Sequence, residues 1–256
     1  MNVDFVRDKK GENPDKTKPV VGVDSFTIVS DEYVEFIHIG KDVRYISDQA
    51  FYYCKKLKAV FVDEENPYFC SVDGSLYTKD MKTLILHPIC NADWLVEEGK
   101  AETNDTFVIP DGVEHIGGYS FYKNTALVHL TFADSVRTIG DMAFFGCNNM
   151  WSIRLPESLE SIGADAFSYC WSMSPIMYIP ASVKSIDHHA FFSCSSLSVF
   201  YMGAENDEGM ELGEDWLPKS LKKGVLNVAP EPQYGKTYEE SLAEKERIDN
   251  ANAQEG

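Results

Sequence analysis

The sequence predicts a strand-dominated α/β solenoid of about nine coils, with 23–24 residues and one parallel strand in each coil. A segment that holds an aliphatic strand end, a turn, Ile, an aromatic step and usually Cys occurs five times, at 39–54, 109–124, 132–147, 155–170 and 179–194. The aromatic Phe of the last four copies recurs after 23, 23 and 24 residues. An apolar strand position continues this period at Ile39, Val62, Leu86, Ile109, Phe132, Leu155, Ile179, Met202 and the segment 224–228.

Each repeat position has a role that follows from the geometry of a coil. Aliphatic residues two apart, such as Val60 and Val62, point to the same side of a strand and fill the interior. Two more inward columns begin at Val43 and Ile46, and the repeated Phe fills the wide end of each coil within a short helical turn. Proline cannot donate a ladder hydrogen bond, so strand pairing is expected to end where one follows the strand. Prolines occupy this place at Pro110, Pro156 and Pro180.

The pattern resembles the BspA-like leucine-rich repeats found in surface proteins of bacteria and some protozoa, because it keeps their Ile-Pro, Ile-Gly, Ala-Phe and Cys positions. The resemblance extends over about 34–228, and the segment 66–88 is similar to the long repeat variant of that family, with a hairpin turn at 79–82. One copy departs from the pattern, at Ser120 and Asn124. The resemblance implies a right-handed leucine-rich repeat rod that binds proteins, at the cell surface or after secretion.

The two ends of the chain differ from its middle. An apolar strand at 20–29 is expected to cap the first coil, and Thr237 with Glu240 forms a capping box at the start of a helix. Degenerate coils are expected at about 59–105 and at about 199–229. The expected parts are an N-terminal segment and cap at 1–30, one solenoid domain at 31–229, and a polar C-terminal helix and tail at 230–256.

The charge and hydropathy of the chain exclude several classes of function. A net charge of −18 without a basic cluster repels phosphate backbones, so nucleic-acid binding is not expected. No apolar run approaches the roughly 20 residues of a membrane span. The segment 1–10 lacks the apolar region of a signal peptide, which leaves a cytoplasmic location as the alternative to the surface location. A monomer is expected.

Four of the six cysteines, Cys54, Cys147, Cys170 and Cys194, share one repeat position with Asn124. A position that accepts both residue types suits an inward bend where a small polar group meets unpaired backbone. The thiols are therefore expected to be free and buried. Neighbouring coils bring them within disulfide range, but stacked parallel side chains do not aim their sulfurs at each other. Cys70 and Cys90 lie outside the pattern and can be exposed.

The search for chemistry gives no catalytic motif, no cofactor and no metal site. No nucleophile elbow, phosphate-binding loop, zinc or calcium motif is present. The pair His188 and His189 is interpreted as a solvated turn, since a metal site needs further ligands. The stretch 206–215 is interpreted as an acidic loop, because its oxygens lack regular calcium-ligand spacing. The pattern Asn104-Asp105-Thr106 matches a glycosylation acceptor.

One surface column is unusual for a solvated strand. The residues between the inward strand pairs should point outward, yet most are apolar or aromatic, and such a patch is typical of a contact surface. The alternative is that terminal segments or a neighbour cover it. A second aromatic stripe, which contains Tyr52, Tyr122, Phe145 and Phe192, is interpreted as packing between coils rather than a sugar-stacking platform. The expected partner-binding residues are Phe61, Ile85, Val108, Thr131, Arg154, Tyr178 and Tyr201.

These observations predict a non-catalytic module for protein–protein interaction or adhesion. The family resemblance implies host or extracellular-matrix proteins as partners. A structural spacer of a larger surface protein is the alternative, and its exposed columns should be polar. A hydrolase or lyase that uses paired carboxylates is a remote third reading, since a convex rod is poorly suited to exclude water.

Overall fold

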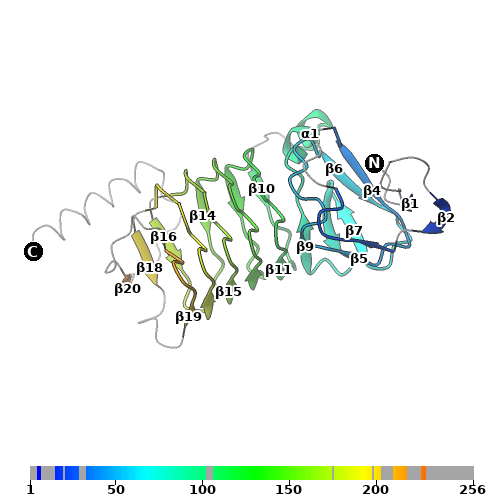
Figure 1. Cartoon of the computed structure of the whole chain (residues 1–256). Helices are drawn as coiled ribbons and strands as arrows, with labels where there is room; N and C mark the ends of the chain where they lie inside the picture. Colours follow the sequence, from blue (N-terminus) through cyan, green and yellow to red (C-terminus); the bar gives the residue numbers. More distant parts are fainter. Residues whose placement is uncertain are drawn as a thin grey trace, which may run out of the picture.

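The chain folds as the strand-dominated solenoid that the repeat predicts. The computed structural model describes residues 5–6, 15–19, 21–28, 33–101, 106–174, 176–197, 199–202, 210–217 and 226–228. Within the described residues the solenoid has about seven coils, where about nine were expected for the whole chain (Figure 1). The prediction of a polar helix at 230–256 lies outside the described residues.

Two parallel ladders of strands run along the solenoid, where the sequence predicted one strand per coil. The second ladder contains the inward Ile residues, such as Ile46 and Ile116, each of which lies in a short extended segment that pairs with a neighbouring strand. One of the backbone hydrogen bonds between neighbouring coils beside this ladder runs from Glu160 N to Arg137 O (2.7 Å). The strands of the first ladder pair in three groups, which are β4 (Phe36–Ile39) with β6 (Ala59–Val62), then β10 (Thr106–Val108), β12 (His129–Thr131) and β14 (Ser152–Arg154), then β16 (Ile176–Ile179), β18 (Val199–Met202) and β20 (Leu226–Val228). The second holds β3 (Gly22–Val23), β5 (Tyr45–Ile46), β9 (Thr83–Leu86), β11 (His115–Ile116), β13 (Thr138–Ile139), β15 (Ser161–Ile162), β17 (Ser185–Ile186) and β19 (Glu211–Leu212).

Where two degenerate coils were expected at about 59–105, the described residues 59–101 form one long coil. The hairpin turn expected at 79–82 is confirmed, because β8 (Ser75–Thr78) pairs antiparallel with β9 and with β7 (Phe69–Val72). The expectation that Leu86 belongs to the first ladder is wrong, since β9 pairs with β11 in the second. The hairpin itself occupies the free edge of β6, where Val60 N donates to Gly74 O (2.9 Å). Helix α1 (Asn91–Glu97) then completes the coil.

The predicted interior columns are buried. The rings of Phe121, Phe144, Phe167 and Phe191 stack from coil to coil, with centroids 4.8, 5.2 and 5.3 Å apart. Each of these rings is at most 1 % exposed. Each ring fills the wide end of its own coil and packs against the ring of the next coil. Successive coils therefore have the same width at this end.

The hairpin separates two apolar cores. The N-terminal core reaches from Val23 to Leu76, and the C-terminal core begins with Tyr77 and Leu84 and continues to Trp216. Leu76 (0 % exposed) and Tyr77 (1 %) are neighbours in β8 and point to opposite faces of the strand. Strand β8 is therefore a wall shared by both cores.

Tight turns replace the helical turn that was expected around each Ala-Phe step. In one coil Met142 (φ +53°) and Gly146 (φ +69°) adopt the left-handed conformation, and Phe145 N donates to Met142 O (3.1 Å). A left-handed residue every few positions prevents a helix from forming. The helical-turn expectation is therefore wrong. Equivalent left-handed residues in other coils are Tyr119, Lys123, Asp165, Tyr169, His189 and Ser193.

In the central coils the Gly that follows Ile lies where neighbouring coils approach each other closely, whereas Ser47 and Asp187 hold this position in two other coils. A Cβ on Gly140 would lie 2.6 Å from Gly118 N and 3.0 Å from Ile116 O. A Cβ on Gly163 would lie 2.5 Å from a carboxylate oxygen of Asp141. These distances are shorter than side chains tolerate, so the Ile-Gly motif sets the coil spacing at this corner.

The N-terminal cap predicted at 20–29 is confirmed in part. Strand β3 pairs parallel with β5, and Val23 and Ile28 are buried against the first coil. Before it, β1 (Phe5–Val6) pairs antiparallel with β2 (Asp15–Pro19). Because β3 pairs with β5, the backbone groups of β5 on this side are not left as an open edge.

Candidate functional site

The central part of the expected binding face is a set of in-register residues on the first ladder. Val108, Thr131 and Arg154 are direct partners on β10, β12 and β14. All three are exposed, and Val108 keeps 59 % of its accessible surface. Parallel strands lie about 4.8 Å apart, so these side chains form one surface. We call this set the strand-face column.

Tyr178 and Tyr201 lie further along the same ladder. They are partners in β16 and β18, but the side chain of Tyr201 lies outside the described residues. Tyr178 is half-buried, and burial together with the carboxylate of Glu157 raises the pKa of its hydroxyl. Tyr178 therefore presents only part of its ring at this face.

Phe61 belongs to a separate aromatic cluster near α1. Its ring lies 6.0 Å from Phe36, 5.1 Å from His38 and 6.0 Å from Trp94 of α1. Trp94 is only 7 % exposed, whereas Phe61 remains 37 % exposed. The chain's own helix thus covers one side of Phe61, a contact that the repeat pattern does not predict.

Ile85 does not join the column. It lies in β9 on the second ladder, half-buried, and its Cα would be 3.5 Å from a Cβ on Gly117. The expectation of one continuous strip from Phe61 to Tyr201 is therefore wrong at this residue. The cause is the hairpin, which moves the segment 83–86 from the first ladder to the second.

Most of the second aromatic stripe packs between coils. Tyr122 stacks on Phe145 (5.2 Å, 12°), and its hydroxyl lies 2.9 Å from that of Tyr52. Two aromatic residues that adjoin this stripe, Tyr169 and Trp171, differ, because they are 36 % and 50 % exposed. They line a groove of about 620 Å³ together with Tyr53, Lys55, Lys123 and Asn148.

The column of cysteines faces inward, as predicted. The thiols of Cys147, Cys170 and Cys194 donate to the carbonyls of Phe121, Phe144 and Phe167 in the preceding coil, over 3.0–3.2 Å. Burial raises the pKa of the Cys147 thiol to about 12. In the equivalent place Asn124 accepts the backbone N–H of Ala126 and Leu127. Cys70 and Cys90 are half-buried.

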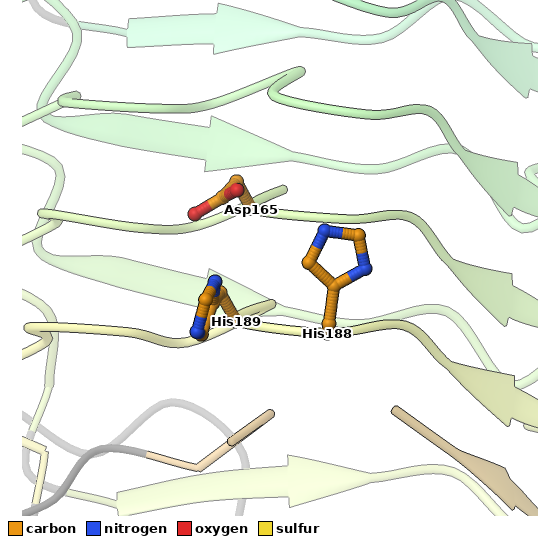
Figure 2. A group of neighbouring side chains, drawn as sticks. All are labelled: Asp165, His188 and His189. Carbon is orange, nitrogen blue, oxygen red and sulfur yellow. The ribbon is translucent and has the colours of Figure 1, made fainter. Parts of the chain in front are cut away.

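Asp165, His188 and His189 lie together on an outer bend (Figure 2). Each offers one ligand atom, and these atoms all lie within 4.8 Å of one another. Sequence reasoning treated the His pair as a solvated turn and missed Asp165. The signal was present, since Asp165 and His189 both directly precede an Ala-Phe step and so stack in neighbouring coils.

Hydrogen bonds orient this cluster. Nδ1 of His188 lies 2.8 Å from Oδ1 of Asp187, and the hydroxyl of Ser168 donates to Oδ1 of Asp165 (2.6 Å). The side-chain hydrogen bond to Asp187 raises the pKa of His188. The pKa of Asp187 is lowered first by the backbone N–H of His188, which donates to its Oδ1, and then by the His188 ring. The charges of Asp165 and Asp141 also raise the pKa of His188. The bend is therefore an anionic setting that attracts cations.

A family model named BspA type leucine rich repeat region matches six copies in the chain, over residues 24–71 and 100–208. These ranges make up more than half of the sequence. The chain belongs to the BspA-type leucine-rich repeat family. The unmatched segment 72–99 holds the hairpin and α1, which are the parts that depart from the repeat.

Several solved bacterial structures share this fold. The pneumococcal vaccine antigen PcpA is 23% identical with a TM-score of 0.63, over 86% of this chain and 55% of that one. A leucine-rich repeat protein from Eubacterium ventriosum is 21% identical with a TM-score of 0.52, over 78% and 55%. A leucine rich cell surface protein from Faecalibacterium prausnitzii is 23% identical with a TM-score of 0.51, over 70% and 51%.

The chain spans little more than half the length of these three solved proteins. No curated protein sequence matches it. Among the described residues, no helix has the length and apolar character that crossing a membrane requires. Proteins of the leucine-rich repeat class are generally non-enzymatic and typically bind other proteins.

Proposed function

We propose that this chain is a non-catalytic module for protein binding or adhesion, and that it contacts its partner through the strand-face column. The observation that carries the proposal is the in-register set of Val108, Thr131 and Arg154, exposed on three neighbouring strands. Arg is one of the residues enriched in protein interfaces, and Arg154 shares this face with the exposed apolar side chain of Val108 two strands away. A chain of net charge −18 suits a partner whose surface is basic overall, because opposite charges speed the encounter.

The alternative function is a structural spacer of a larger surface protein. A spacer needs only polar outward positions, whereas Val108, at one end of the column, leaves 59 % of its surface in water. That exposure carries a cost in free energy unless a partner covers it. Binding is therefore the better explanation of this face.

A surface or secreted location accompanies this proposal. It rests on the family and on the Faecalibacterium relative, which is described as a cell surface protein. A cytoplasmic location is the alternative. Mass spectrometry of fractionated native cells tests this, and recovery in the cytosol alone would reject the surface location.

The binding experiment compares two double variants on immobilised extracellular-matrix proteins. V108S with R154A changes the column, and V72S with K184A changes an exposed valine (41 %) and an exposed cation outside it. The column variant should bind at least about 30-fold more weakly, because a central anchor contributes roughly 2 kcal/mol. The control should bind like the wild type. Equal losses in both variants, or none in either, would reject the column as the binding face.

A further inference from the structure

We propose that Asp165, His188 and His189 form a binding site for a divalent transition-metal ion, with Zn²⁺ as the ion that suits the donor set. Two imidazole nitrogens and one carboxylate oxygen are ligands that zinc accepts in proteins. Calcium and magnesium prefer oxygen ligands alone. This site is separate from the strand-face column and does not depend on the proposed protein-binding function.

The geometry of the three side chains is close to that of a metal site. Their ligand atoms lie within 4.8 Å of one another. Ligands of a tetrahedral zinc ion, with bonds of about 2.0–2.2 Å, lie roughly 3.4 Å apart, so small side-chain rotations complete the site. Figure 2 shows His188 and His189 on one coil with Asp165 on the coil beside it, and a ring nitrogen of each His turned to the side of Asp165.

The backbone at the site is fixed by bonds between coils. Asp165 N donates to His188 O (3.1 Å), and His189 N donates to Glu214 O (3.2 Å). Both Asp165 (φ +52°) and His189 (φ +56°) adopt the left-handed conformation of the repeated turn. The hydroxyl of Ser168 lies within hydrogen-bond distance of Asp165 Oδ1 (2.6 Å) and His189 O (2.8 Å). The ligands therefore need little ordering when an ion binds.

Asp187 prepares His188 for coordination. Its Oδ1 lies 2.8 Å from Nδ1 of His188, so the neutral ring that donates this proton keeps a lone pair on Nε2. A carboxylate that holds the far nitrogen of a ligating His is the usual outer partner in zinc sites. The charged groups that act on His188 are the carboxylates of Asp187, Asp165 and Asp141. Three negative charges around one bend stabilise a bound dication.

Three protein ligands leave one position of a tetrahedral ion open to water. Such a site differs from a closed structural zinc site with four protein ligands. Because its ligands come from neighbouring coils, a bound ion would link them across the outer bend.

Isothermal titration with zinc chloride tests this site on the full chain. The wild type should bind one ion, and D165N and H188Q should each weaken binding at least about tenfold. D187N should also weaken it, because His188 loses its orienting partner. H129Q is the matched control, since His129 is an exposed His on β12, and it should bind like the wild type.

Cys70 and Cys90 are the half-buried thiols that could bind zinc independently, so the titration is repeated with C70S and C90S combined. Binding should persist there, and an excess of calcium should not compete. Circular dichroism verifies that each variant folds, with H189Q as the substitute if H188Q does not. The proposal is overturned if the wild type takes up no zinc, if D165N and H188Q bind normally, or if removing the two cysteines abolishes binding.

Discussion

Lowering the pH should destabilise this protein through one buried histidine, His87. The side chain is 3 % exposed, and its ring lies 4.1 Å from Phe107 and 5.0 Å from Phe121. Its Nδ1 lies 2.9 Å from the hydroxyl of Ser75, which is also buried. Burial disfavours the imidazolium form and lowers the pKa of His87 to about 3.

The size of the effect follows from the difference in pKa between the two states. The unfolded chain binds a proton at His87 below its ordinary pKa of 6.5, whereas the folded chain does not until about pH 3. The contribution of His87 to stability is therefore complete above pH 6.5 and is lost as the pH falls toward 3. The loss is about 1.4 kcal/mol per pH unit, which gives roughly 2 kcal/mol between pH 6.5 and pH 5.

Urea unfolding of the wild type and of an S75A and H87F double variant measures this term. Phe keeps an aromatic ring between Phe107 and Phe121, and Ala removes the hydroxyl that would lose its partner. The difference in unfolding free energy between the two proteins should shift by about 2 kcal/mol in favour of the variant from pH 6.5 to pH 5. Other titrating groups cancel in this difference. A difference that stays constant with pH would refute the reasoning, because His87 would then protonate equally in both states.

Three further predictions concern the coil interior. F144A should lower the free energy of unfolding by roughly 3 to 5 kcal/mol, because it removes the middle of the ring stack; a loss below 1 kcal/mol in calorimetry would contradict this. G140A should lower the thermal midpoint more than G22A, since a Cβ at Gly22 meets its nearest neighbour, Tyr45, at 3.6 Å whereas one at Gly140 meets backbone at 2.6 Å; the reverse order would count against the spacing argument. Thiol titration should find few reactive groups in the folded protein and six after denaturation; four or fewer in total would indicate disulfides.

The repeat period predicted most of the fold because every coil places the same residue types at the same interior positions. One Phe, one small residue and two aliphatic columns recur every 23–24 residues, so their inward direction could be read directly. The second strand of each coil was missed because two residues are too few to show alternation. The residues involved, such as Ile116 and Ile139, were nevertheless placed correctly in the interior.

The coil at 59–105 could not be predicted because its length equals two periods. Counting by period placed Leu86 and Ile85 on the first ladder, but the antiparallel pairing of β8 with β9 has its own register. The cluster of Asp165 with His188 and His189 was missed for a different reason. It depends on which outward residues of neighbouring coils meet, and no single coil contains that information.

The wall that β8 forms between the two cores has a mechanical consequence. Among the described residues, each ladder of paired strands is interrupted at this coil, and β7, β8 and β9 take its place. A tensile load along the solenoid would cross this coil through the hairpin, with Leu76 anchored in one core and Tyr77 in the other, and through side-chain contacts such as that of Tyr52 with Tyr122. Under such a load the two cores behave as two segments in series. In a single-molecule extension experiment, the two cores should yield as separate events.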